Sequence, residues 1–143
     1  MISITIATSS ELSDIATLLQ GVRGDTSTMT NGQFIVAKDG SEVVGCVRIK
    51  VLDKDCLELA SLAVKEEYRG KGIGSKLIDK ILRVELRRPI YLLCFLPKQE
   101  FYERAGFEIV KVTELPGILK LEYDRVYEKL SGSKLEIIAM RHI

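Results

Sequence analysis

The sequence lacks the features that are typical of several large classes of protein. Its 143 residues contain no apolar run near the roughly 20 residues that a membrane-spanning helix needs. Lys and Arg number 21 against 20 Asp and Glu, which leaves a net charge of +1. A charge so near zero gives no electrostatic case for a nucleic acid or an anionic membrane as the main partner. At the N-terminus Ile2, Ile4 and Ile6 alternate with polar residues, which predicts a strand and not a signal peptide.

Metal-ligating residues are scarce as well. The single histidine, His142, stands next to the C-terminus, and the three cysteines form no Cys-x-x-Cys pair. We therefore expect no zinc site and no other metal. Cys46, Cys56 and Cys94 are odd in number and lie in apolar, strand-like runs, so we expect buried, reduced thiols in a cytoplasmic protein. Cys94 is a poor nucleophile because its apolar run has no histidine nearby in sequence.

The length and the apolar content of 46% predict one domain, residues 1–143, with a core large enough to be stable. Three strands in a meander lead into a strand–helix–strand crossover, which predicts a mixed sheet in an α/β or α+β domain. Alternating and helical apolar spacing predict strands near 2–7, 33–38, 43–51, 57–64, 90–95, 107–110 and 135–140, and helices near 12–19, 73–86, 97–105 and 118–130.

The segment Leu57–Arg83 changes its apolar period part-way along. Leu57–Val64 has the alternation of a strand, and after Arg69–Ser75, a run with three glycines, apolar residues recur with helical spacing. The first turn of a helix has N–H groups without partners, and the helix dipole adds positive charge there. Glycines let the backbone approach a ligand closely. This order of strand, glycine-rich turn and helix predicts a site for a phosphate or diphosphate.

The glycine pattern separates this loop from two familiar phosphate loops. A Walker loop ends in Lys followed by Ser or Thr, whereas here Ser75 precedes the lysine. The dinucleotide loop needs Gly-x-Gly-x-x-Gly, whereas Gly70, Gly72 and Gly74 run Gly-x-Gly-x-Gly. The run does fit Arg/Gln-x-x-Gly-x-Gly/Ala as Arg69-x-x-Gly72-x-Gly74. It thereby resembles the acetyl-CoA loop of the GNAT superfamily of N-acetyltransferases; the alternative is a glycine-rich turn without a ligand.

A second motif supports the resemblance. Phe101–Phe107 is similar to the GNAT segment Phe-Tyr-x-x-x-Gly-Phe and lies at a distance from the Arg69 loop that suits the family. Motif identity is confined to Glu58–Ser75 and Phe101–Phe107, and the order of elements agrees from Ile2 to Ile109. The resemblance implies a mixed, mostly antiparallel sheet of six to seven strands flanked by helices, with a V-shaped splay between strands 4 and 5.

The resemblance also implies a reaction, acetyl transfer from acetyl-CoA to an amine. Tyr102 matches the family position whose phenol faces the CoA sulfur and would donate a proton to the leaving thiolate; the alternative is a core aromatic. Glu58 is the candidate base. By alternation it shares an apolar strand face with Ala60, Leu62 and Val64, where a carboxylate would have a raised pKa. The alternative is a solvent-facing carboxylate without a chemical role.

For the cofactor, the resemblance implies that main-chain groups around Leu62, Ala63 and Val64 pair with the pantetheine arm. Main-chain N–H groups of the loop would hold the diphosphate. The asparagine that many members have near the start of the helix after the fifth strand is missing here, and Lys98 would reach an adenosine phosphate instead. The loop residues so implied are Arg69, Gly70, Lys71, Gly72, Ile73, Gly74 and Ser75.

The C-terminal third is similar to that of members related to N-acetylglutamate synthases, in which Leu-Pro-x-x-Leu follows the Gly-Phe strand, as Leu115–Leu119 does here. This similarity favours an amino acid as the acceptor. The loop 21–32 is expected to be a connector, although the family often places the acceptor beside this region. Candidates for binding an acceptor carboxylate are Arg23, Arg48, Lys50 and Arg125, each more often a solvated surface charge.

These observations predict a cytoplasmic, acetyl-CoA-dependent N-acetyltransferase that acts by direct attack, with no covalent enzyme intermediate. The acceptor is a primary amine of a small molecule, an amino acid or a protein N-terminus. The main alternative is a CoA-binding regulatory module without acetyl transfer, and a third is transfer of a longer acyl group. A homodimer is common in the family and stays open.

Overall fold

A computed structural model describes all residues 1–143. Its seven-stranded sheet has the order β1-β2-β3-β4-β5-β7-β6 and is antiparallel except between β4 and β5. This confirms the predicted mixed, mostly antiparallel sheet. The strands are β1 (Ile2–Ile6), β2 (Phe34–Asp39), β3 (Glu42–Asp53), β4 (Cys56–Val64), β5 (Ile90–Phe95), β6 (Glu108–Val110) and β7 (Ile137–His142), and the helices are α1 (Leu12–Gly21), α2 (Ile73–Val84), α3 (Gln99–Glu103) and α4 (Gly117–Lys129).

The chain divides into two compact units. Unit 1 consists of Met1–Ile49 and Ala60–Leu86, and unit 2 consists of Lys50–Leu59 and Arg87–Ile143. Strands β3 and β4 each contribute residues to both units.

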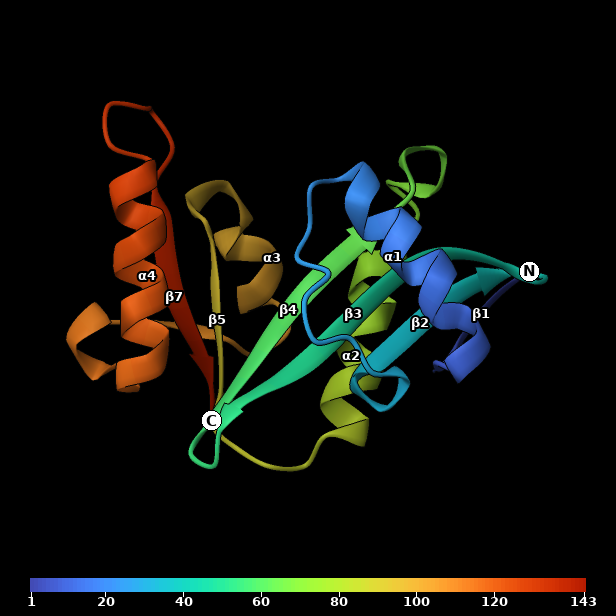
Figure 1. The fold of residues 1–143 in the computed structure, drawn as a ribbon, viewed down its shortest axis with the longest axis horizontal. Helices are drawn as coiled ribbons and strands as arrows, with labels where there is room; N and C mark the ends of the chain where they lie inside the picture. Colours follow the sequence, from blue (N-terminus) through green and yellow to red (C-terminus); the bar gives the residue numbers. More distant parts are fainter. The chain divides into compact units, whose positions relative to one another are not determined.

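In unit 1, α1 and α2 cover opposite faces of the strands (Figure 1). The consecutive strands β2, β3 and β4 are neighbours in the sheet, as the predicted meander requires, and β1 pairs antiparallel with β2, with Ile2 opposite Asp39. Because both faces are covered, the first four residues of β2 are all buried. Gly45 lies where α2 approaches: an added Cβ would stand 3.1 Å from Leu77 Cδ1. The core on the α1 side comprises Ala7, Ile15, Leu18, Leu19, Phe34, Val36, Val43, Cys46 and Ala63.

Unit 2 is built around β5, which pairs in parallel with the start of β4 and antiparallel with β7. Parallel pairs join Leu57 to Ile90 and Glu58 to Tyr91. The short strand β6 pairs with the outer edge of β7. Helix α4 packs against this part of the sheet through Leu119, which is fully buried. The core on this side comprises Cys56, Tyr91, Val110, Leu115, Leu119 and Ala139.

The predicted strands and helices begin and end within two residues of the observed bounds. The helix expected from Pro97 to about Ala105 is divided: a 3-10 turn, Leu96–Lys98, precedes the five-residue α3. Cys46 and Cys56 are buried as expected, whereas Cys94 is half-exposed; all three are free thiols. None of the helices combines the length and the hydropathy that crossing a bilayer requires.

Candidate active site

The glycine-rich loop has the backbone that its sequence predicts. It connects the 3-10 turn Glu66–Tyr68 to α2, and it places Gly70 at φ +77° and Gly72 at φ +79°. Gly72 is the N-cap of α2, and its carbonyl accepts the Lys76 N–H at 3.1 Å. The N–H groups of the first helical turn, which follow Gly72, have no partner within the helix. A Cβ added at either glycine would meet no atom within 4 Å, so the left-handed φ and not a lack of space favours glycine at both positions.

Three contacts within unit 1 hold this loop. Arg69 Nε donates to the carbonyl of Val64 at 2.9 Å, which links the loop to the end of β4. The Tyr68 hydroxyl donates to Asp39 Oδ2 at 2.8 Å, and this hydrogen bond raises the pKa of Tyr68 to about 12 and lowers the pKa of Asp39. Lys71 Nζ lies 5.6 Å from the centre of the Tyr68 ring. Two cationic side chains, Arg69 and Lys71, are therefore positioned at the loop.

Strand β4 departs from regular geometry just before the loop. Ser61 has φ +59°, a left-handed conformation that is uncommon for a residue with a Cβ. The burial pattern nevertheless keeps its alternation past this residue: Leu57, Leu59 and Ala63 are buried, whereas Glu58, Ala60, Leu62 and Val64 are only partly buried. Main-chain groups at Leu62, Ala63 and Val64 belong to unit 1, with the loop.

Glu58 lies in unit 2, at the end of the paired stretch of β4, opposite Tyr91 on β5. Its side chain is half-buried. Two residues earlier, the Cys56 thiol is fully buried, and burial raises its pKa to about 11, with a smaller contribution from the negative charges of Asp53 and Glu58. Glu58 therefore lies beside the unit 2 core and not on a fully solvated face.

Tyr102 is also in unit 2, on α3, where its side chain is 9% exposed. Its ring makes edge-on contacts with Phe101 at 5.0 Å and with Phe107 at 6.0 Å between ring centres. Burial raises the pKa of the phenol, and the neighbouring Cys94 raises it further. The pKa of Cys94 is itself raised to about 11 by burial, so this thiol is a poor nucleophile. At neutral pH the phenol is protonated and able to donate.

His142, to which the sequence assigns no role, packs beside the second motif. Its ring packs edge-on against Phe107 at 5.2 Å, and its Nδ1 accepts a hydrogen bond from Arg88 Nε at 3.1 Å. Gly106 follows α3 at φ +99°, and a Cβ added there would lie 2.8 Å from His142 Nε2, so a side chain at this position would displace the imidazole. The Gly-Phe pair of the second motif is thus held by a histidine from β7. No local pattern indicated this contact.

Arg48 was expected to be a solvated charge or a carboxylate ligand, and the structure corrects both expectations. It is fully buried, at 0% exposure, and its guanidinium is bonded within unit 1. Arg125 forms an ion pair with Glu122 on the surface of α4, as a solvated charge would. Lys98 is exposed where the 3-10 turn meets α3.

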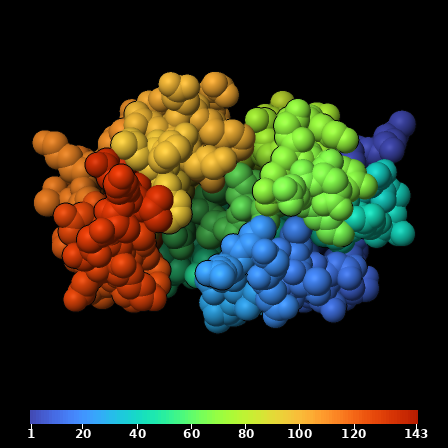
Figure 2. Space-filling model, turned by 90° about the horizontal axis from the view of Figure 1, so that it is seen from above, coloured from blue at the N-terminus to red at the C-terminus, as the bar shows by residue number.

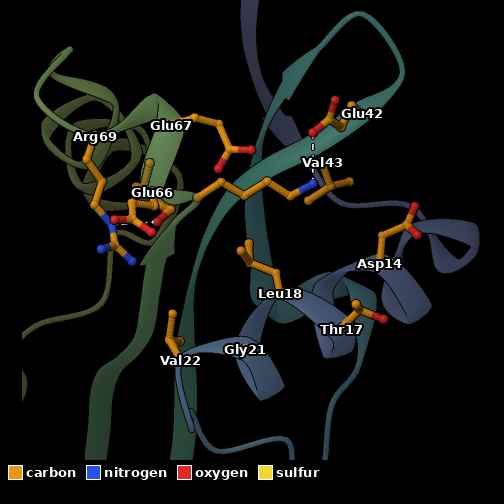
Figure 3. Close-up of a pocket in the computed structure, with 12 residues that line it drawn as sticks. Asp14, Thr17, Leu18, Gly21, Val22, Glu42, Val43, Glu66, Glu67 and Arg69 are labelled. Carbon is orange, nitrogen blue, oxygen red and sulfur yellow. Dashed lines mark hydrogen bonds and ion pairs between the residues drawn. The ribbon is translucent and has the colours of Figure 1, made fainter.

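A cavity of about 550 Å³ lies in unit 1 between α1 and the segment that precedes the glycine loop (Figure 3). In Figure 2 the lime-green surface of that segment and α2 borders the blue surface of α1. Lys65 lines the cavity and pairs with Glu42 at 2.8 Å. Four carboxylates and two cations line it, a charge balance that disfavours phosphate. These residues are Asp14, Glu42, Glu66, Glu67, Lys65 and Arg69.

The sequence of residues 30–109 matches the family described as the acetyltransferase (GNAT) domain. Because that match covers more than half of the chain, this protein belongs to the GNAT acetyltransferase domain family. An amino-acid acetyltransferase of Mycobacterium tuberculosis is 33% identical over 91 residues, which are 61% of this chain and 51% of the relative. The chain spans about half the length of the curated relatives that it matches first.

Solved structures share the fold. Rv2747 from Mycobacterium tuberculosis, in complex with CoA and NLQ, superimposes with a TM-score of 0.80 at 23% identity, over 99% of this chain and 98% of that one. N-acetylglutamate synthase from Neisseria gonorrhoeae, complexed with coenzyme A and N-acetyl-glutamate, gives a TM-score of 0.74 at 22% identity, over 100% of this chain and 35% of that one. The fold expected from the two motifs is therefore confirmed.

Proposed function

We propose that this protein is an acetyl-CoA-dependent N-acetyltransferase that acts on a primary amine. The observation that carries the proposal is the loop between β4 and α2, where left-handed Gly70 and Gly72 open the N-terminus of a helix in a chain of the GNAT family. A diphosphate would be held there by the N–H groups of Gly72, Ile73, Gly74 and Ser75, with Arg69 and Lys71 beside them. Gly70 supplies the turn that precedes the helix.

The remaining binding roles follow from the same proposal. The pantetheine arm would pair with main-chain groups of Leu62, Ala63 and Val64, of which the Val64 carbonyl also accepts a hydrogen bond from Arg69. Lys98 is exposed and would pair with an adenosine phosphate. We also propose that residues 1–143 act as one domain, because β3 and β4 continue through both units.

The chemistry is a direct attack. The neutral amine nitrogen forms a bond to the acetyl carbonyl carbon, and the bond from that carbon to the CoA sulfur breaks. Tyr102 donates its hydroxyl proton to the departing thiolate, and Glu58 accepts the proton that the amine loses, directly or through water. The buried, protonated phenol and the half-buried carboxylate support these two roles.

An amino acid is the favoured acceptor because curated relatives are named amino-acid acetyltransferases and a structural neighbour contains N-acetyl-glutamate. We place the protein in the cytoplasm on the ground of its three free cysteines. The homodimer that is common in the family stays a prediction, which sedimentation of the purified protein tests.

Calorimetry with CoA and mass detection of acetylated products from a panel of amino acids and amines test the proposal. We expect CoA binding and turnover with at least one amine. CoA binding without any turnover favours the regulatory module, and a folded sample that binds no CoA contradicts the proposal.

Two substitutions test the catalytic roles. Tyr102→Phe is expected to lower kcat by about a hundredfold while the Kd for CoA stays within about twofold. Tyr127→Phe is the matched control, because that tyrosine is 64% exposed on α4. Glu58→Gln is expected to lower kcat most at low pH and least at high pH, where the amine loses its proton without a base. Unchanged kcat in both variants, with CoA still bound, would show that the assigned roles are wrong.

A further inference from the structure

Arg48 is the only buried charged residue in the chain. It lies on β3 in unit 1, next to the core that α1 covers, and its guanidinium carbon lies 5.2 Å from the centre of the Phe34 ring. A buried charge is tolerated when its hydrogen-bonding groups are satisfied, and it becomes strongly unfavourable when one partner is removed. Separating Arg48 from any of its hydrogen-bond partners would therefore destabilise the folded protein, which favours the positions that these partners occupy.

The guanidinium joins two segments that are distant in sequence. Nη1 donates to the carbonyl of Ser27 at 3.0 Å, and Nη2 donates to the carbonyl and to the carboxylate of Asp25 at 2.9 and 3.2 Å. Nε donates to Ser61 Oγ at 2.9 Å. One side of the fork thus holds the loop between α1 and β2, and the other holds β4.

The residue that Arg48 holds on β4 is the one in the left-handed conformation. Ser61 has φ +59°, and its carbonyl accepts a further hydrogen bond from the Cys46 thiol at 3.3 Å. A non-glycine residue keeps such a conformation only where its surroundings enforce it. The main chain of Leu62–Val64 follows directly, so its direction depends on the conformation of Ser61.

We propose that Arg48 is a positioning residue: it fixes Ser61 of β4 against the Asp25–Ser27 loop and thereby sets the main chain of Leu62–Val64 that receives the thioester arm. The effect of Arg48 on catalysis rests on the proposed function, whereas its effect on the conformation of β4 and the loop does not. Arg48 does not contact the substrate. Because Arg48 forms hydrogen bonds to both the Asp25–Ser27 loop and β4, a change that makes one of these segments more mobile also makes the other more mobile.

Arg48→Lys tests the inference because lysine keeps the charge and lacks the planar fork that reaches both segments. Arg83→Lys is the matched control, since Arg83 lies on the outer face of α2 with its side chain 76% exposed. We expect faster hydrogen exchange in residues 22–30 and 61–64 of the Arg48 variant only. We also expect KM for acetyl-CoA to rise by about tenfold to a hundredfold, with a smaller change in kcat.

Asp25→Ala provides the second test, in case Arg48→Lys does not fold. The Asp25 side chain is 48% exposed, so its removal leaves the core packing intact. If Arg48 transmits the change, exchange accelerates in residues 61–64 as well as in the loop. Acceleration confined to the loop, or an Arg48→Lys variant with unchanged exchange and unchanged KM, overturns the inference. A wild-type protein that binds no CoA contradicts the proposed function instead, and the exchange measurements still decide the role of Arg48.

Discussion

His142 shows how a single residue can couple stability to pH. Burial lowers the pKa of His142, and the adjacent Arg88 guanidinium lowers it further. A histidine whose pKa is lower in the folded than in the unfolded protein favours folding while it is neutral. Its contribution is present above the unfolded value near 6.5 and is lost as pH falls through the folded value.

We therefore expect the free energy of unfolding to fall more steeply between pH 7 and pH 5 in the wild type than in His142→Gln. One titrating group contributes a slope of at most about 1.4 kcal/mol per pH unit. Urea unfolding at several pH values measures both slopes, and the carboxylates that titrate below this range are common to both proteins. Equal slopes would contradict this reading of His142.

At the scale of the element, the loop before α2 depends on backbone conformation more than on side chains. Gly72 is left-handed, whereas Gly117, the first residue of α4, is not, and neither position has an atom within 4 Å of an added Cβ. The two glycines therefore form a matched pair that differs in φ and not in available space.

Gly72→Ala is expected to lower the free energy of unfolding by about 1–2 kcal/mol, because L-residues are disfavoured in the left-handed region. It should also weaken CoA binding, since the loop would have to leave the conformation that opens the helix N-terminus. Gly117→Ala is expected to be neutral or to stabilise by up to about 1 kcal/mol. Thermal unfolding and calorimetry with CoA test both variants, and equal effects of the two substitutions would argue against a conformational role for Gly72.

At the scale of the whole molecule, the two compact units share β3 and β4. A strand that belongs to two cores cannot unfold in one of them without fraying in the other. We expect the chain to unfold in a single cooperative transition.

Leu77→Ala in unit 1 and Leu119→Ala in unit 2 test this, because both side chains are fully buried. Each should lower the free energy of unfolding by about 2–5 kcal/mol, and both should move the same transition. Leu121→Ala is the control, since Leu121 is 72% exposed on α4. Two separate transitions, each moved by only one core substitution, would show that the units unfold independently.

Much of the fold and of the anion loop was predictable from local patterns. Alternating and helical apolar spacing located the elements, and the glycines of the loop after β4 indicated left-handed turns at a helix N-terminus. These features depend on residues close in sequence, where hydrogen bonding and φ preferences act directly. The roles of Glu58 and Tyr102 stay predictions, since they depend on a bound ligand.

What the amino-acid sequence determined by itself was the family, the sheet, and the loop before α2, because short-range spacing is enough to specify each. Tertiary structure alone decided that Arg48 is buried, that Ser61 of β4 is held in a left-handed conformation, and that His142 lies against Gly106. Each of these depends on groups 13 or more residues apart in the chain, as the bond from Arg48 to Ser61 illustrates. Periodicity says nothing about such partners, since only folding brings them within hydrogen-bond distance.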